Sequence, residues 1–454
     1  MTVTLAAAPP PEIRREAVSS MEKFVIQGGA PLSGTIVPAG NKNAALPLLA
    51  AALLTAEEVV LHNVPRIRDV GAMLDLLAGL GVKVGRPEAN TVVLQADSVT
   101  TTDVDAGLAE QIRASFLVAG PLLARFGQAL LPPPGGDVIG RRRLDPHLDA
   151  FRALGAEVEH GRDIRLRTNG AGLRACDFFM DEPSVMATEN ALMAAALTPG
   201  TTVIQNAASE PHVQDLARML VRMGAAIEGI GSNVMAVHGV AELGGCEHTV
   251  GPDHIEIGAF MALAGVTGGE LRIKDCISDD LRMIRLAFGR LGLRSEFDDG
   301  DIVVPGGQKL MVARDAGDYQ SKVEDGPWPA FPADLTSIAV ALATQAEGSV
   351  LIFEKMFENR LFFVDKLISM GAEITICDPH RAIVIGPRRL RGQRLASPDI
   401  RAGMAILIAA LCAEGESEIA NVDMIDRGYE RIDERLRALG ARIERVASER
   451  VPAL

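Results

Sequence analysis

The hydrophobic and polar positions of this chain repeat one pattern six times. Each copy is the end of an amphipathic helix, a Leu-Gly or Met-Gly pair, and a strand of alternating apolar and polar residues, as in "FRALGAEVE" and "LISMGAEIT". Glycine fits the left-handed position after a helix C-terminus. The six glycines, 68 to 79 residues apart, are Gly81, Gly155, Gly224, Gly292, Gly371 and Gly440. This period exceeds the roughly 20–50 residues of solenoid repeats and predicts a compact αβ unit repeated six times.

A second pattern marks the other end of each unit. It is a helix of small apolar residues, a turn, and a strand rich in Thr, Val and Glu, as in "MAAALTPGTTVIQNA" and "VALATQAEGSVLIFE". Helices that are apolar on all sides are buried at the centre of a domain. The sequence therefore predicts sheets packed around inner helices, with three units in each of two domains. The pattern alone does not fix where the chain divides.

Composition excludes several classes of protein. The chain has 454 residues, of which 48% are hydrophobic and 23% charged, so it is globular and large enough for two or three domains. A net charge of −14 and only 4% aromatic residues argue against a nucleic-acid partner. The five cysteines are widely spaced and form no ligand cluster, so we expect free thiols and no metal.

The first twenty residues hold three consecutive prolines and no apolar core of a signal peptide. We expect residues 1–20 to be a disordered tail. Apolar runs such as "AGMAILIAALCA" are too short to cross a bilayer. The sequence therefore predicts a cytoplasmic protein with no membrane partner.

Five cations lie near the starts of helices, although the helix dipole favours acidic residues there. They are Lys42, Arg113, Arg360, Arg401 and Arg427, with Asn359, Asp399 and Asp426 as the expected N-caps of the last three. Helix starts bind anions through free N–H groups, and guanidinium groups bind phosphate or carboxylate through paired hydrogen bonds. If these starts converge, they form a site for a strongly anionic ligand. Taken singly, each cation could equally be an exposed first-turn residue.

Two aspartates are candidates for proton transfer. Asp334, in "WPAFPADLTSIAVAL", is either an N-cap or a carboxylate that accepts a proton from a hydroxyl group. Asp137, in "PPPGGDVIGRRR", is either part of an exposed turn or active beside a bound anion. Among the histidines, His147 is close enough in sequence to this loop to contact a ligand, whereas we expect His212 and His254 to be structural or surface residues.

A series of short motifs runs in order along the chain from about residue 21 to 446, including "NKNAALP", "PGGDVIGRR", "PSVMATEN", "NAASEP", "PAFPADL", "FENR", "DIRAG" and "IDRGYER". Together these motifs resemble those of the enolpyruvyl transferases, and within them the branch that acts on UDP-N-acetylglucosamine. The resemblance implies a two-domain, inside-out α/β barrel fold with six βαβαββ-type units. It also implies that residues 42–251 form domain I and that residues 21–41 plus 252–454 form domain II.

The activity implied by the resemblance is transfer of the enolpyruvyl group of phosphoenolpyruvate to the 3′-hydroxyl of UDP-N-acetylglucosamine. Phosphate is released, and the reaction runs by addition and elimination through a tetrahedral intermediate. This is the first committed step of peptidoglycan precursor synthesis, on which cell-wall biogenesis, cell shape and cell division depend. No cofactor, metal or obligate protein partner is implied.

The resemblance also implies roles for individual residues. The catalytic residues would be Lys42, Asp137, Asp334 and Arg427. Phosphoenolpyruvate would be bound by Lys42, Asn43, Arg142, Arg360, Arg401 and Arg427. The UDP-sugar would be bound by Arg113, Arg142, Arg143, Leu144, Asp145, Pro146, Glu182, Pro183, Ser184, Val185, Asp334 and Met356.

The chain departs from the family pattern at several positions. Asp137 stands where the family loop usually carries the cysteine that fosfomycin alkylates, so we expect insensitivity to fosfomycin. Arg143 and Met186 are unusual residues in the segments implied to bind the acceptor. Two alternatives therefore stay open: a paralogous transferase for another uridine nucleotide or hydroxyl acceptor, and an inactive nucleotide-sugar-binding protein.

The charge on Asp137 needs an explanation of its own. A general acid must hold a proton near neutral pH, whereas an ordinary aspartate is ionised and the adjacent arginines favour the ionised form. We expect Asp137 to be ionised in the open enzyme and to take up a proton as the anionic substrate binds. The glycines around it predict a mobile lid.

Overall fold

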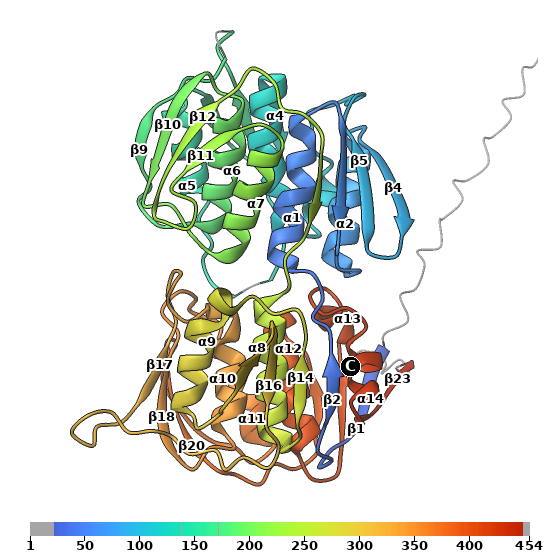
Figure 1. Ribbon diagram of the computed structural model, residues 1–454, viewed down its shortest axis with the longest axis vertical. Helices are drawn as coiled ribbons and strands as arrows, with labels where there is room; N and C mark the ends of the chain where they lie inside the picture. Colours follow the sequence, from blue (N-terminus) through green and yellow to red (C-terminus); the bar gives the residue numbers. More distant parts are fainter. Residues whose placement is uncertain (1–21, 138, 171, 448–454) are drawn as a thin grey trace, which may run out of the picture.

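A computed structural model describes residues 22–137, 139–170 and 172–447. The tail predicted for residues 1–20 lies outside the described residues, as does Val138 within the loop of Asp137. The described chain forms an upper and a lower lobe, each with helices inside and strands outside (Figure 1). This is the inside-out arrangement that the all-apolar helices predict.

Three helices of small apolar residues lie at the centre of each lobe. They are α1 (Lys42–Ala51), α4 (Ala119–Phe126) and α6 (Val185–Ala196) above, and α8 (His254–Thr267), α10 (Thr336–Ala343) and α12 (Ile400–Cys412) below. Nearly every residue of α6, α8 and α12 is buried. In the lower lobe the three helices pack against one another, because small side chains allow close approach on every side.

Six amphipathic helices alternate with these along the chain. They are α2 (Arg68–Gly79), α5 (Asp145–Ala153), α7 (Pro211–Arg222), α9 (Ser278–Arg290), α11 (Val364–Ser369) and α14 (Ile432–Ala438). Short elements complete the helical set: α3 (Ala106–Ala109), α13 (Val422–Ile425), and the 3₁₀ turns η1 (Ala52–Leu54), η2 (Arg113–Val118) and η3 (Ala333–Leu335).

The six repeat glycines end the amphipathic helices. Gly81, Gly155, Gly224, Gly292, Gly371 and Gly440 all have positive φ, between 87° and 112°. Each follows its helix by two residues and is followed in turn by a strand. The predicted role of glycine at the left-handed position is therefore confirmed in all six units.

Six small sheets cover the helices. The upper sheets have the strand orders β13 (Cys246–Thr249)-β3 (Glu58–His62)-β5 (Thr91–Gln95)-β4 (Lys83–Glu88), β6 (Gln128–Leu131)-β8 (Ile164–Arg167)-β7 (Glu157–His160), and β11 (Ala226–Glu228)-β12 (Val234–Gly239)-β10 (Gly200–Gln205)-β9 (Asp177–Phe179). The lower sheets are β15 (Glu296–Asp298)-β16 (Asp301–Val304)-β14 (Leu271–Ile273)-β2 (Gly34–Ile36), β17 (Lys322–Glu324)-β18 (Gly348–Phe353)-β20 (Arg381–Gly386)-β19 (Glu373–Asp378), and β21 (Arg394–Ala396)-β22 (Glu416–Ala420)-β1 (Glu22–Gln27)-β23 (Arg442–Ala447).

In each lobe, some strands pair with strands that are far from them in the sequence. Strand β1 lies between β22 and β23, and β2 pairs in parallel with β14, so the N-terminal strands complete lower sheets. Strand β13 pairs in parallel with β3 of the upper lobe. The upper hydrophobic core draws on residues 44–250, and the lower core on residues 24–36 and 255–443. On this pairing we propose the domain bounds 42–251 for one domain and 21–41 plus 252–454 for the other.

Two adjacent segments cross between the lobes. The Asn41 N–H donates to the Gly251 carbonyl at 2.8 Å, and the Asp253 N–H donates to the Ala39 carbonyl at 2.9 Å. A side chain at Gly40 would overlap the Asn63 carbonyl, so glycine is required for this close approach. The crossing places Lys42, at the start of α1, directly between the two lobes.

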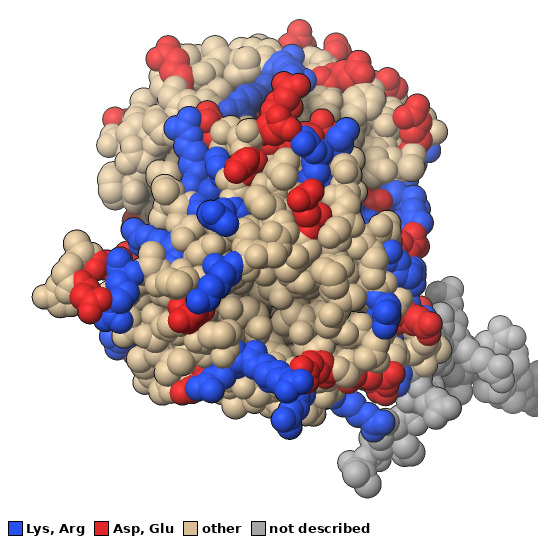
Figure 2. All heavy atoms as spheres, turned by 60° about the horizontal axis from the view of Figure 1, so that its bottom comes forward, with Lys and Arg blue, Asp and Glu red and all other residues tan. Residues whose placement is uncertain are grey.

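On the face shown in Figure 2, lysine and arginine side chains are interspersed with aspartate and glutamate. Charges of both signs therefore share this surface. The concentration of arginine that the sequence predicts lies elsewhere, in the space between the lobes.

Candidate active site

A cavity of about 270 Å³ lies where the inner helices of both lobes begin. Its lining includes first-turn residues of all six, counting the 3₁₀ turns that lead into α4 and α10: Lys42, Arg113, Val185, His254, Asp334 and Arg401. Six positive helix ends around one cavity favour an anionic ligand. All five cations that the sequence singles out, Lys42, Arg113, Arg360, Arg401 and Arg427, line this cavity.

Eleven of the predicted site residues line this cavity. They are Lys42, Asn43, Arg113, Asp137, Arg142, Val185, Asp334, Met356, Arg360, Arg401 and Arg427. Asp399 caps α12 as expected, since its carboxylate accepts from the Arg401 and Ala402 N–H groups at 2.9 Å.

Two expected N-caps are wrong. Asn359 lies in a turn ahead of α11, which begins only at Val364. Asp426 follows α13, and its carboxylate pairs with Arg445 rather than with a helix start. Arg360 and Arg427 therefore reach the cavity from turns, where the backbone conformation depends on tertiary contacts that local sequence does not encode.

Asp69 and Asp137 bridge the first group of cations. Asp69, in the first turn of α2, accepts from Lys42 Nζ at 2.8 Å and from Arg427 Nε at 2.8 Å. Arg427 also pairs through Nη1 with Asp137. Burial lowers the pKa of Lys42 below its ordinary value, and the charge on Asp69 offsets part of this shift.

Asp334 organises the second group. Its two carboxylate oxygens accept from Arg360 Nη2 at 2.9 Å and from Arg401 Nη2 at 2.8 Å, while Asn43 Nδ2 approaches to 3.4 Å. Burial raises the pKa of Asp334, but Arg401, Arg360 and Lys42 together outweigh burial and hold the pKa well below its usual value. Asp334 is thus ionised and paired with arginines, and its expected alternative role as an N-cap is wrong.

The segment "PPPGGDVIGRRR", residues 132–143, is called the arginine loop here, and it extends from the upper lobe to the lower one. The Asn359 N–H donates to the Ile139 carbonyl at 3.1 Å, and the Arg141 N–H donates to Glu358 Oε2 at 3.2 Å. Gly140 has φ +139°, and a side chain there would overlap Glu358 Oε2. The loop thereby brings Asp137 and Arg142 against the cations of the lower lobe.

Comparison with known proteins decides the family. Residues 26–436 match the family described as EPSP synthase (3-phosphoshikimate 1-carboxyvinyltransferase). The chain belongs to this family of enolpyruvyl transferases. It is therefore an enzyme of the transferase class.

Three curated relatives share about half of their residues with this enolpyruvyl transferase. The chain is 56% identical to the UDP-N-acetylglucosamine 1-carboxyvinyltransferase of Bradyrhizobium diazoefficiens, over 93% of this chain and 98% of that protein. It is 54% identical to the protein of that name from Treponema denticola, over 93% and 99%. The Borreliella burgdorferi protein of that name is 50% identical, over 94% and 100%.

Solved structures confirm the fold of this enolpyruvyl transferase. The enolpyruvyl transferase NikO from Streptomyces tendae superimposes with a TM-score of 0.83 at 24% identity, covering 95% of this chain and all of that one. EPSP synthase from Acinetobacter baumannii gives a TM-score of 0.72 at 17% identity, over 94% and 100%. Within the described residues, no helix is long and apolar enough to cross a membrane.

Seven residues implied to bind the acceptor are not part of the cavity lining. They are Arg143, Leu144, Asp145, Pro146, Glu182, Pro183 and Ser184. Arg143 forms ion pairs with Asp181 at 2.8 Å, with Asp145 at 3.3 Å and with Glu182 at 3.4 Å. This cluster ties the arginine loop to the start of α6 beside the cavity, and the acceptor contacts of these residues stay a prediction.

The structure adds residues that the sequence did not single out for the site. Asp69, Glu189, Glu210, His212 and His254 all line the cavity. The sequence predicts that His147 lies near the ligand and that His212 and His254 are structural or surface residues, but the cavity lining shows the opposite. His212 and His254 lie in the site, whereas His147 is buried and shares a hydrogen bond with Asn190 at 3.0 Å. Two features of the sequence could have pointed to these residues. They are the tripeptide "EPH" at the start of α7 and Glu189, an acid within the apolar helix α6.

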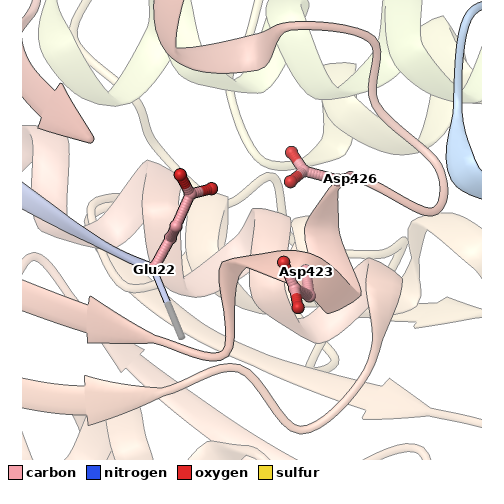
Figure 3. A group of neighbouring side chains, drawn as sticks. All are labelled: Glu22, Asp423 and Asp426. Carbon is pink, nitrogen blue, oxygen red and sulfur yellow. The ribbon is translucent and has the colours of Figure 1, made fainter. Parts of the chain in front are cut away.

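One group of acids has the spacing of a metal site. Glu22, Asp423 and Asp426 approach one another on β1 and around α13 (Figure 3). Arginines already pair with all three: Arg445 contacts Glu22 at 2.9 Å and Asp426 at 2.7 Å, and Arg68 contacts Asp423 at 2.9 Å. These pairs account for the cluster, and Arg68 thereby joins the upper lobe to the lower.

Proposed function

We propose that this enzyme transfers the enolpyruvyl group of phosphoenolpyruvate to the 3′-hydroxyl of UDP-N-acetylglucosamine and releases phosphate. The observation that carries the proposal is the meeting of two aspartates with six cations in one cavity between the lobes. The names of relatives with about 50% identity along almost the whole chain support this choice of acceptor. The product would be the first committed precursor of peptidoglycan.

Phosphoenolpyruvate carries a phosphate and a carboxylate, and the cavity offers cations for both. Lys42, Arg142 and Arg427 surround Asp137, and Arg360 and Arg401 surround Asp334. A trianion placed among them would exchange the present aspartate pairs for charge-assisted bonds to phosphate and carboxylate. Lys42 and Arg427 would then stabilise the charge that develops on the departing phosphate.

Asp334 is suited to act on the acceptor. Its carboxylate is ionised, and Asn43 lies beside it to orient a hydroxyl group. As the 3′-oxygen forms a bond to C2 of phosphoenolpyruvate, Asp334 accepts the hydroxyl proton. The electron pair of the C2–C3 double bond takes a proton at C3, which gives the tetrahedral intermediate.

Asp137 is suited to supply that proton to C3. It lies 15% exposed in the cavity and pairs with Arg427, a cation that the substrate phosphate would attract away. The incoming negative charge then favours the protonated carboxyl group. Elimination breaks the C2–O bond to phosphate and returns a proton from the new methyl group to Asp137. The proton that Asp334 took from the hydroxyl group passes to the departing phosphate, so charge and protons balance.

The proposal needs only small-molecule substrates, and no nucleic-acid, membrane or protein partner takes part in it. Phosphoenolpyruvate and nucleotide sugars are made inside cells, so the proposed place of action is the cytoplasm. The enzyme would contribute there to cell-wall synthesis.

Phosphate release from phosphoenolpyruvate tests the proposal across a panel of acceptors. We expect release with UDP-N-acetylglucosamine and none with UMP or 3-phosphoshikimate. Release with another uridine nucleotide alone would favour the paralogous transferase, for which Arg143 and Met186 are the motivating departures. Tight binding of the nucleotide sugar with no release would favour the inactive binding protein.

A further inference from the structure

One wall of the cavity plays no part in the reaction steps above. It consists of Glu189 on α6, Glu210 and His212 at the start of α7, and His254 on α8. Glu189 is 1% exposed and His212 is 7% exposed. Within the described residues, Glu189 Oε1, Glu210 Oε2 and His212 Nδ1 have no hydrogen-bond partner. Buried polar atoms without partners are rare, and here they belong to residues that line the proposed substrate cavity.

The charge of this wall differs from that of the cationic part. Neither Glu189 nor Glu210 forms an ion pair within the described part of the chain. Burial raises the pKa of Glu189 well above its ordinary value, with repulsion from Glu210 adding to the shift, and burial also raises the pKa of Glu210. Burial lowers the pKa of His212 to about 3 and of His254 to about 4. All four shifts favour the uncharged form of these side chains.

Neighbouring groups hold three of the four side chains in place. The rings of His212 and His254 are stacked with centroids 6.3 Å apart, and Trp328 lies edge-on to His254 at 6.2 Å. Asn41 Nδ2 donates to His254 Nδ1 at 3.0 Å, and the Trp328 N–H donates to Glu210 Oε1 at 3.3 Å. His212, His254 and Glu210 are thus held in place, while Glu210 Oε2 and His212 Nδ1 have no hydrogen-bond partner among the described residues.

The other charged groups of the cavity lie on different elements around this wall. They are Arg113 on η2, Arg142 on the arginine loop, Asp334 on η3, Arg360, Arg401 on α12, and the Lys42, Asp69, Asp137 and Arg427 network. The ion pairs among them join Lys42, Arg360, Arg401 and Arg427 to Asp69, Asp137 and Asp334. Within the described residues, neither glutamate of the wall has a counter-ion. A trianion would be attracted to the cations and away from the glutamates.

We propose that Glu189, Glu210 and His212 bind the nucleotide-sugar acceptor through its uncharged hydroxyl, amide or carbonyl groups and select it over other acceptors. The proposal rests on the function proposed above. Protonated carboxyl groups donate hydrogen bonds to acceptor oxygens, and His212 accepts or donates one as a neutral ring. A ligand that lacks these groups leaves buried polar atoms unpaired and is rejected.

A pH dependence of acceptor binding follows. As pH rises, the carboxyl groups lose their protons and become negative charges without counter-ions. They then repel the diphosphate of the acceptor and cease to donate hydrogen bonds. The KM for the acceptor should therefore rise on the alkaline side, while the KM for phosphoenolpyruvate, bound by the cations, should change much less.

The test compares two double variants over pH 6.5 to 9.5. Glu189→Gln with Glu210→Gln keeps uncharged hydrogen-bonding groups of the same shape, and Glu189→Ala with Glu210→Ala removes them. We expect the Ala variant to raise the KM for UDP-N-acetylglucosamine about tenfold to thirtyfold with little change in the KM for phosphoenolpyruvate. The Gln variant should stay within about threefold of the wild type and lose the alkaline rise. Glu228→Gln, an exposed glutamate on β11, is the matched control.

Calorimetric binding of UDP-N-acetylglucosamine, without phosphoenolpyruvate, separates this proposal from the proposed function. If the wild-type protein binds this ligand but releases no phosphate, the proposed function is wrong. The affinities of the wild type and the Ala variant can still be compared in that case. Equal affinities of the wild type and the Ala variant would overturn the role of the wall, as would equal rises in both KM values. If the Ala variant fails to fold, the affinities of the Gln variant and of the single variant Glu210→Ala for UDP-N-acetylglucosamine are compared with that of the wild type instead.

Discussion

Arg427 forms an ion pair through Nη1 with the carboxylate of Asp137. Arg427 lies between α13 and α14 of the lower lobe, and Asp137 lies on the loop that follows β6 of the upper lobe. The contact joins the lobes across the cavity and pairs the proposed proton donor to C3 with a cation. On the proposed mechanism, substrate binding changes the partner of Asp137 and gives it a proton.

The first prediction concerns that proton. Binding of phosphoenolpyruvate together with UDP-N-acetylglucosamine should take up about one proton at pH 7.5, because the substrate phosphate takes over Arg427 and repels the carboxylate. Calorimetry in buffers of different ionisation enthalpy measures the uptake. The Asp137→Asn variant should bind without it, and an uptake unchanged in that variant would assign the proton to another group.

The second prediction concerns the unusual identity of residue 137. Asp137→Cys should keep measurable activity and become covalently modified by fosfomycin, since a thiolate in this position is the nucleophile that the family loop usually supplies. Mass spectrometry detects the adduct, and the wild type should form none. A Cys variant that stays unmodified after long incubation would show that the loop is placed differently from the family loop. Asp137→Ala should lose most activity.

The third prediction concerns Asp334. The change Asp334→Asn should lower kcat by about 10² to 10⁴, because the amide cannot accept the hydroxyl proton. In the wild type the pKa of Asp334 is held well below its usual value, so no loss of activity between pH 7 and pH 5 should arise from its protonation. Rate profiles of both proteins check this. A normal kcat in the Asn variant would remove Asp334 as the base.

The fourth prediction concerns the contact between the arginine loop and the lower lobe. Gly140→Ala should raise the KM for phosphoenolpyruvate by at least about tenfold, because the methyl group would displace the loop from Glu358 and carry Arg142 away. Gly170→Ala is the matched control, since Gly170 also has positive φ but a methyl group there meets nothing within 4 Å. Equal effects of the two changes would show that backbone strain, not the Glu358 contact, is responsible.

The repeat and its inner helices could be predicted from the sequence because both rest on local rules. Glycine is required at a left-handed position such as that of Gly155, and a helix without a polar face must be buried. The partner strands could not be predicted in this way, because β1 and β13 pair with strands far along the chain. Their pairing depends on how distant segments of the chain come together in the fold, and the local sequence pattern does not encode this.

The site was predictable where a cation stood at a helix start, as at Lys42 and Arg401. Sequence could not reveal Asp69, because an acid in the first turn of an amphipathic helix is ordinary and only the fold brings it to Lys42. Glu189 was hidden for a related reason. An acid within an apolar helix has meaning only when the space beside it is known to be a cavity.

The most direct test of the account is proton NMR of the reaction mixture with phosphate measured in parallel. We predict that phosphoenolpyruvate and UDP-N-acetylglucosamine give one phosphate per acceptor consumed and a product with two vinyl protons, its enolpyruvyl group attached at the 3′-oxygen. Phosphate release accompanied by free pyruvate, with the nucleotide sugar unchanged, would contradict enolpyruvyl transfer.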